Sequence, residues 1–316
     1  MVDSRQAVSV LDIGTSSVRI LGVARADSAS HGGLRSVLDR GILTRLGKDR
    51  RPDGGLDPDA VERTRRAVLE LGELARSQGA DVRAAVGTSA LRDARGASSV
   101  HALLEEAAGC RVEIISGERE AELVVRGVKT SHGLDGPFAL LDAGGGSTEI
   151  VQGRDGDVES LVSLDLGAGR LLQDAEERGL SSPDALLALA REKLLDAKER
   201  RGWTPGSYEA GIYGLGGTVT TLAALSLALR TFDPETIEGH VLHVDEIRRL
   251  ALRLAGLDTD RRRTLQGMEP GREDLVVPGA AVVLAVASCL GGSSLVVTNH
   301  GIRWGLAAEI LDAACF

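Results

Sequence analysis

The sequence predicts an α/β protein that contains two related domains. Hydrophobic runs typical of strands alternate with amphipathic stretches typical of helices in both halves of its 316 residues. One pattern occurs twice, at Asp12–Ser17 and at Asp142–Glu149: a hydrophobic run, an aspartate, a turn of small residues and a second hydrophobic run. A chain of this length suits about two domains of ordinary size. The repeat indicates two related domains that close on one phosphorylated ligand.

The two turns predict phosphate binding. A strand, a tight turn and a second strand make a β-hairpin, and its glycines let the backbone approach a ligand closely. Exposed N–H groups and the hydroxyls of serine and threonine can then hold phosphate oxygens. A single turn of this kind is usually only a tight hairpin, but the repetition favours phosphate. The predicted phosphate-binding residues are Gly14, Thr15, Ser16 and Ser17 in the first turn, and Gly144, Gly145, Gly146 and Ser147 in the second.

The remaining elements follow from periodicity and turn residues. Asp57 and Pro58 predict a helix start, because proline fits the first turn of a helix. The first half then predicts a strand over 36–43, a helix from 58, a strand over 81–87, a helix over 98–108, a strand over 112–115 and a helix from 116. The second half predicts a third hairpin strand over 160–166, an amphipathic helix over 183–199, a strand, glycine turn and helix over 211–229, helices over 244–254 and 278–290, a strand over 295–298 and a closing helix from 303.

Composition argues against several classes of protein. A chain with 43% hydrophobic and 26% charged residues is typical of soluble globular proteins. The net charge of −9 and the 2% aromatic content argue against a nucleic-acid binder. Cys110, Cys289 and Cys315 lack CxxC spacing, which indicates a reducing compartment. The first residues contain no signal-peptide core, and the longest apolar stretch, 280–290, is too short to span a bilayer. We therefore expect a cytoplasmic protein with no membrane partner.

Several segments, taken in order, resemble the exopolyphosphatase/guanosine pentaphosphate phosphatase (Ppx/GppA) family. The matching segments are Asp12-Ile-Gly-Thr-Ser-Ser-Val-Arg19, Thr44-Arg-Leu-Gly47, Gly87-Thr-Ser-Ala-Leu-Arg-Asp93, Ile114-Ile-Ser-Gly-Glu-Arg-Glu-Ala121, Leu141-Asp-Ala-Gly-Gly-Gly-Ser-Thr-Glu-Ile150, Gly214-Leu-Gly-Gly-Thr218, Pro270-Gly-Arg-Glu-Asp274 and Gly301-Ile-Arg303. The resemblance implies two actin-like (ribonuclease H-like) domains around a central phosphate-binding cleft, as in the superfamily of actin, heat-shock chaperones and sugar kinases. The implied domains are 1–127, with the closing helix 303–316 packing back on it, and 128–302.

The resemblance also implies catalytic roles. Glu120 matches the family's catalytic glutamate, which positions and deprotonates the attacking water, and Arg92 matches an arginine that reaches the substrate phosphate. From the residues alone, Glu120 could instead be an acidic residue favoured by the start of a helix. Arg92 could likewise be half of a surface ion pair with Asp93. Glu149 matches an acidic residue that holds Mg²⁺ or the water.

Three carboxylates make up the implied metal site. Asp12 and Asp142 match paired aspartates that face the metal, and Glu149 joins them. Carboxylate and phosphate oxygens are the ligands that Mg²⁺ prefers, and Mn²⁺ can substitute. Gly216, Gly217 and Thr218 match a segment that contacts adenosine in related kinases and lines the phosphate cleft in the phosphatases.

The sequence departs from the family pattern near both ends. Ser16 replaces a common asparagine, and Asn299 and Trp304 replace an aspartate and a glutamate around the Gly-Ile-Arg segment. These changes bear on substrate preference. The chain ends at Phe316 without the C-terminal helical domain of longer members, so we expect a preference for short polymers.

The expected reaction is Mg²⁺-dependent hydrolysis of terminal phosphate from inorganic polyphosphate, with Glu120 activating the water. The alternative within the family is removal of the 5′ γ-phosphate of guanosine pentaphosphate, a reaction of the stringent response. Alternatives outside it are an ATPase or kinase of the same fold, and a non-catalytic binder of polyphosphate or nucleotide. The expected partner is the polyanionic substrate. The oligomeric state is left open, with a homodimer as the assembly considered.

Overall fold

A computed structural model describes residues 7–26, 33–48, 53–201, 203–208 and 211–313. Contacts between Cα atoms divide the chain into two compact units. Unit 1 contains residues 1–132 and 300–316, and unit 2 contains residues 133–299. The domain prediction from sequence places the corresponding boundaries at 127/128 and 302/303.

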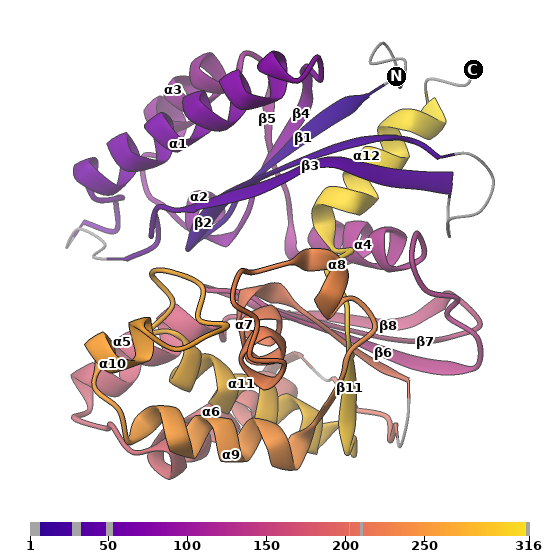
Figure 1. The fold of residues 1–316 in the computed structure, drawn as a ribbon. Helices are drawn as coiled ribbons and strands as arrows, with labels where there is room; N and C mark the ends of the chain where they lie inside the picture. The colour runs from indigo at the N-terminus through magenta and orange to yellow at the C-terminus, as the bar shows by residue number, and fades with distance from the viewer. Residues whose placement is uncertain (1–6, 27–32, 49–52, 202, 209–210, 314–316) are drawn as a thin grey trace. The chain divides into compact units, whose positions relative to one another are not determined.

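Within the described residues, the sheet of unit 1 has five strands. An antiparallel meander is formed by β1 (Val8–Ile13), β2 (Ser17–Arg25) and β3 (Leu34–Leu43). Two further strands, β4 (Val82–Gly87) and β5 (Val112–Ile114), continue the sheet in parallel from the other side of β1. The resulting order is β3-β2-β1-β4-β5 (Figure 1).

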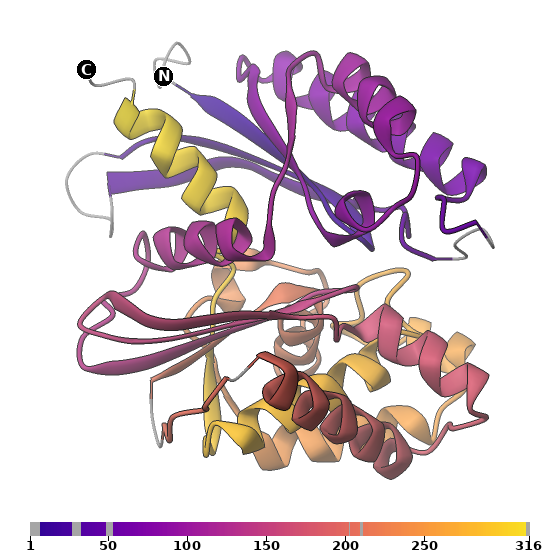
Figure 2. The same cartoon turned by 180° about the vertical axis from the view of Figure 1, so that it is seen from behind.

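Helices pack on the sheet of unit 1. The long helix α1 (Pro58–Ser77) begins where the Asp57 side chain accepts a hydrogen bond from the Ala60 N–H, at 2.8 Å. It packs beside α3 (Ser98–Ala108), and the short α2 (Ser89–Arg92) follows β4. The helix α4 (Gly117–Val128) pairs with α12 (Ile302–Ala313), which also packs on β1 and β2 (Figure 2). The last three residues of the predicted closing helix, 314–316, lie outside the described part of the chain.

Glycines let α4 and α12 approach each other closely. A methyl group on Gly305 would overlap the carbonyl oxygen of Leu123. A Cβ on Gly127 would lie 2.6 Å from the carbonyl oxygen of His300. The glycines in both helices are therefore required by the packing of α12 within unit 1.

The sheet of unit 2 has six strands in the part of the chain that the structure describes. The antiparallel meander consists of β6 (Pro137–Ala143), β7 (Thr148–Arg154) and β8 (Asp157–Leu164). Next to β6 runs the parallel β9 (Ile212–Leu215), followed by the parallel β11 (Ser294–Val297) and the antiparallel edge strand β10 (Val241–His243). The strand β8 begins earlier than predicted, because Asp155 and Gly156, with φ of 51° and 81°, close the β7–β8 hairpin.

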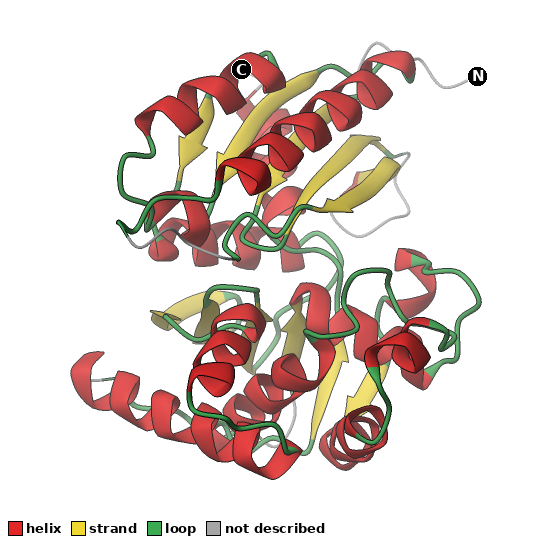
Figure 3. Cartoon of the chain, turned by 90° about the vertical axis from the view of Figure 1, so that its left-hand side faces the viewer, coloured by secondary structure: helices red, strands yellow, loops and turns green. Residues whose placement is uncertain are grey.

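Helices of unit 2 pack on this sheet (Figure 3). They are α5 (Ala168–Glu177), α6 (Pro183–Arg201), α7 (Gly216–Ser226), α8 (Pro234–Ile237), α9 (Val244–Ala255), α10 (Thr259–Arg263) and α11 (Val276–Cys289). Residues 276–287 of α11 are all buried, and α11 packs against α5, α6, α7 and α9. This helix is therefore the centre of the core of unit 2.

The two units share one topology. Starting from the third hairpin strand, the orders are β3-β2-β1-β4-β5 and β8-β7-β6-β9-β11, with parallel and antiparallel neighbours at the same places. This confirms the predicted α/β class with two related halves. Within the described residues, no helix is both long enough and apolar enough to cross a membrane.

Candidate active site

The first predicted phosphate turn, in unit 1, connects β1 to β2. The Gly14 N–H closes the turn by donating to the carbonyl oxygen of Ser17 at 2.9 Å. Asp12 is the next-to-last residue of β1 and lies opposite Arg19 of β2. The hairpin therefore places one carboxylate beside the turn, as the sequence predicts.

The carbonyl groups of this turn are held by the segment after β3. The N–H of Gly47 donates to the carbonyl oxygen of Thr15, and those of Thr44 and Arg45 donate to that of Ser16, all at 2.9–3.0 Å. Arg45 makes this contact from a left-handed backbone conformation, with φ of 54°. Because the C=O and N–H of a trans peptide point in opposite directions, the next two N–H groups of the turn point away from this segment.

Asp12 has an unsatisfied carboxylate oxygen. Its Oδ1 is inaccessible to solvent and has no hydrogen-bond partner in the part of the chain that the structure describes. Burial raises the pKa of Asp12 to about 6, against the opposing charges of Arg303 and Arg19. A buried oxygen without a donor is costly, and a divalent cation would remove that cost. The chemistry of Asp12 therefore fits the predicted Mg²⁺ ligand.

Asp12→Asn is expected to stabilise the metal-free protein at neutral pH. The pKa of Asp12 is about 6 in the native state, against an ordinary value of 3.8 for an aspartate in an unfolded chain. The native state thus binds the Asp12 proton more tightly than the unfolded state does. The Asp12 carboxyl therefore lowers the free energy of unfolding by an amount that grows as pH rises from about 4 to 6 and stays constant above pH 6. The shift corresponds to at most about 3 kcal/mol.

Urea unfolding in excess chelator between pH 4 and pH 8 measures this difference. The stability gained by Asp12→Asn should be small at pH 4 and largest above pH 6. Asp59→Asn, at an exposed position in the first turn of α1, is the matched control and should show no such pH dependence. An Asp12→Asn protein that is less stable than wild type at pH 8 would contradict the prediction.

Glu120 and Arg92 lie in contact within unit 1. Glu120 is in the first turn of α4 and is only 6% exposed. Arg92, at the end of α2, donates from Nη1 to Glu120 Oε2 at 3.2 Å and to the carbonyl oxygen of Ile115 at 2.9 Å. The alternative partner Asp93 is more distant, with 3.9 Å between Arg92 Nε and Asp93 Oδ1. The structure thus brings the predicted base and the predicted phosphate-binding arginine together.

The second predicted phosphate turn, in unit 2, repeats the geometry of the first. Gly144 N–H donates to the carbonyl oxygen of Ser147 at 3.0 Å, and Asp142, the next-to-last residue of β6, lies opposite Glu149 of β7. The carbonyl groups of this turn are also held from one side, here by the first turn of α5, which follows β8. Both halves of the chain therefore present a hairpin turn that is fixed in the same way.

Ser163 is a partner of the candidate site that sequence reasoning missed. Glu149 is 2% exposed, and Ser163 lies directly opposite it on β8. The Ser163 hydroxyl donates to Glu149 Oε1 at 2.7 Å. This bond fixes the orientation of the Glu149 carboxylate. Strand alternation in the sequence places Ser163 on a face of β8, but the register that pairs it with Glu149 comes from the fold.

Arg272, which lies in the matching segment Pro270-Gly-Arg-Glu-Asp274, is a second partner of the candidate site. Gly216 begins α7 with φ of 87°, and a Cβ there would lie 2.8 Å from Asp142 Oδ1. The guanidinium of Arg272 packs directly on Gly217, so that a methyl group on Gly217 would overlap it. Arg272 is 7% exposed and pairs with Glu269. Gly216, Gly217 and the buried Thr218 thus form a glycine turn covered by a cation.

The predicted site residues divide between the two units. Unit 1 holds Asp12, Gly14, Thr15, Ser16, Ser17, Arg92 and Glu120, and unit 2 holds Asp142, Gly144, Gly145, Gly146, Ser147, Glu149, Gly216, Gly217 and Thr218. Across the described residues, no three His, Cys, Asp or Glu side chains form a group that could hold a metal ion. The shared Mg²⁺ site of Asp12, Asp142 and Glu149 stays a prediction.

Two sheets of one topology, each with an aspartate and a small-residue turn on its first hairpin, define an actin-like fold. A model of the Ppx/GppA phosphatase family matches residues 23–314. The chain belongs to this family, which confirms the predicted resemblance.

Curated relatives and solved structures agree with this assignment. Exopolyphosphatase 2 of Mycobacterium tuberculosis is 32% identical, over 96% of this chain and 98% of that protein. The guanosine-5′-triphosphate,3′-diphosphate pyrophosphatase of Aeromonas hydrophila is 27% identical, over 96% of this chain but 59% of that protein. The crystal structure of the Aquifex aeolicus Ppx/GppA family member superimposes with a TM-score of 0.75 at 27% identity and covers 98% of both chains.

Proposed function

We propose that this protein is an exopolyphosphatase that releases orthophosphate from the end of inorganic polyphosphate. The observation that carries the proposal is the match to exopolyphosphatase 2 of M. tuberculosis, which spans 96% of this chain and 98% of that one. The site supports a phosphoanhydride hydrolase, because two hydrogen-bonded turns offer N–H groups for phosphate oxygens and a buried carboxylate lies against an arginine.

Each proposed residue has a task that its surroundings support. Glu120 accepts the proton of the attacking water, and Arg92 contacts its carboxylate through Nη1. The other guanidinium nitrogens of Arg92 would bind the substrate phosphate. The N–H groups of the turn at Gly144–Ser147 stabilise charge on the phosphate oxygens. Glu149, which accepts a hydrogen bond from Ser163, holds the metal or the water.

Asp12, Asp142 and Glu149 are the residues proposed to hold Mg²⁺, with Mn²⁺ as a substitute. The unsatisfied Oδ1 of Asp12 supports this assignment. When bound, the metal would neutralise phosphate charge.

Guanosine pentaphosphate is the second candidate substrate. The pyrophosphatases of two Aeromonas species, which are named for that nucleotide, are 27% and 28% identical to this chain. In both cases the chain spans 59% of the relative. Polyphosphate is favoured because the exopolyphosphatase match has higher identity and extends over 96% of this chain and 98% of that protein.

Phosphate release from four substrates, assayed side by side, tests the proposal. We expect kcat/KM to be highest for tripolyphosphate and then, in order, for long-chain polyphosphate, guanosine pentaphosphate and ATP. Short chains should be favoured because a net charge of −9 repels a long polyanion. The difference in kcat/KM between short and long chains should widen at low salt, where this repulsion is less screened. A preference for guanosine pentaphosphate would support the second candidate, a preference for ATP would indicate an ATPase or kinase, and binding without release would indicate a silent binder.

A further inference from the structure

The first turn of α5 holds three successive carbonyl groups of the second glycine turn. The N–H of Ala168 donates to the carbonyl oxygen of Gly144 at 3.0 Å, and that of Gly169 donates to the carbonyl oxygen of Gly145 at 2.8 Å. The Arg170 N–H shares the Gly145 oxygen at 3.2 Å. The main chain of α5 thus fixes two of the three carbonyl groups.

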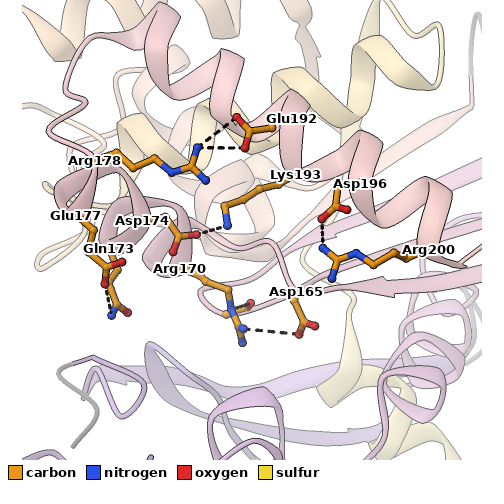
Figure 4. A network of polar contacts seen from close by, with 11 residues as sticks. Asp165, Arg170, Gln173, Asp174, Glu177, Arg178, Glu192, Lys193, Asp196 and Arg200 are labelled. Atoms are coloured by element: carbon orange, nitrogen blue, oxygen red, sulfur yellow. Dashed lines mark hydrogen bonds and ion pairs between the residues drawn. The ribbon is translucent and has the colours of Figure 1, made fainter. Parts of the chain in front are cut away.

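The third carbonyl is held by a side chain. Arg170 donates from Nε to the carbonyl oxygen of Gly146 at 3.0 Å. Its Nη1 lies 3.8 Å from Oδ1 of Asp165, the residue that follows β8, and Figure 4 shows the guanidinium directed toward this carboxylate. Arg170 is 31% exposed at its side chain, so its charge is partly withdrawn from water.

Gly167 makes this arrangement sterically possible. A Cβ on Gly167 would lie 2.6 Å from the carbonyl carbon of Gly145 and 2.7 Å from the nitrogen of Gly146. A Cβ on Gly169 would lie 3.1 Å from the Gly145 oxygen. The backbone of α5 therefore lies directly against the backbone of the turn.

The direction of the carbonyl groups determines the direction of the N–H groups. In a trans peptide the two point in opposite directions. With the carbonyls of Gly144, Gly145 and Gly146 directed at α5, the N–H groups of Gly145, Gly146 and Ser147 are directed away from it. Three N–H groups on one face form an anion-binding concavity. The last of them, on Ser147, depends on Arg170.

We propose that Arg170 is a positioning residue that keeps the Gly146–Ser147 peptide in the orientation that binds phosphate. This inference rests on the proposed function, because it assigns the turn to the substrate phosphate. Once the guanidinium is removed, none of the α5 hydrogen bonds described above fixes the Gly146 carbonyl, and glycine adopts more backbone conformations than other residues.

The rest of α5 is anchored independently of Arg170. Lys193 of α6 pairs with Asp174 at the middle of α5, and Arg178, at the end of α5, donates to both carboxylate oxygens of Glu192 at 3.1 and 3.3 Å (Figure 4). Arg178 and Glu192 are 49% and 61% exposed. A substitution of Arg178 therefore removes an arginine ion pair at the end of the same helix but leaves the hydrogen bonds to the glycine turn in place. It provides the matched control.

The test compares Arg170→Gln, Arg170→Lys and Arg178→Gln with the wild-type protein. Steady-state hydrolysis of tripolyphosphate should show kcat/KM about 10- to 100-fold lower for Arg170→Gln, the effect of losing one charge-assisted hydrogen bond. Arg170→Lys should recover part of the loss, because its ammonium can still donate to the Gly146 oxygen. Arg178→Gln should equal wild type, and all variants should share its melting temperature within a few degrees.

Hydrogen exchange of the ligand-free protein supplies a readout that does not depend on activity. Peptides covering 142–149 should exchange faster in Arg170→Gln than in wild type or Arg178→Gln. Equal exchange and equal kcat/KM in Arg170→Gln and wild type would overturn the inference, as would equal losses in Arg170→Gln and Arg178→Gln. If wild type releases no phosphate from any of the four substrates, the proposed function fails, and the exchange comparison still decides whether Arg170 holds the turn.

Discussion

Glu120→Gln should lower kcat for tripolyphosphate by about 10²- to 10⁴-fold, the usual effect of losing a general base. Glutamine keeps the shape of the side chain and an oxygen that can still accept the hydrogen bond from Arg92, so the contact at 3.2 Å need not be lost. Only the ability to take up a proton disappears. The KM and the affinity for tripolyphosphate, measured by titration calorimetry, should therefore change much less than kcat.

Glu118→Gln is the matched control for this variant. Glu118 lies in the same first turn of α4 but is exposed, whereas Glu120 is buried. If the acidic residues act only through the partial charge at the start of the helix, the two variants should have similar, small effects on stability and none on kcat. Turnover of Glu120→Gln near the wild-type rate would remove Glu120 from the mechanism.

Removal of divalent metal should lower the hydrolysis rate by about three orders of magnitude or more, since a bound metal contributes several kcal/mol of charge stabilisation. The structural reason is the buried Asp12 Oδ1, which lacks a donor among the described residues; Asp142 and Glu149 are the other proposed ligands. We expect chelation to abolish phosphate release and either Mg²⁺ or Mn²⁺ to restore it.

Circular dichroism and thermal unfolding in chelator separate this loss from unfolding. The fold should persist without metal, because each unit has its own hydrophobic core. Asp12→Asn should raise the Mg²⁺ concentration needed for half-maximal activity, and Asp59→Asn should leave it unchanged. Full activity in a metal-stripped sample with excess chelator would contradict the metal site.

Features that depend on local sequence could be predicted well. The two hairpin turns are encoded by adjacent residues: a strand, an aspartate and small residues that permit a closed turn. The resulting Gly14–Ser17 and Gly144–Ser147 hydrogen bonds appear in the structure as expected. The helix start at Pro58 also follows from a local rule, since proline at the first position and Asp57 as the cap act within one turn.

Features that depend on contacts distant in sequence could not be predicted in this way. Arg170 donates to Gly146, 24 residues earlier, and Ser163 donates to Glu149, 14 residues earlier. Arg272 covers Gly217 although the two lie on separate segments. In each of these three contacts, strand register or helix packing determines which residue is the partner. Periodicity shows which face a residue occupies, whereas the neighbour on that face is determined only when the sheet and its helices assemble.

The packing of α12 has a consequence for synthesis on the ribosome. The helix follows all of unit 2 along the chain but packs against α4, β1 and β2 of unit 1. Unit 2 is one continuous stretch and can fold as soon as it has emerged, because domains generally fold as units during synthesis. Unit 1 is made first yet cannot be completed until residues 302–313 leave the exit tunnel. The surfaces of α4, β1 and β2 that α12 covers therefore gain this cover only after all of unit 2 has been translated.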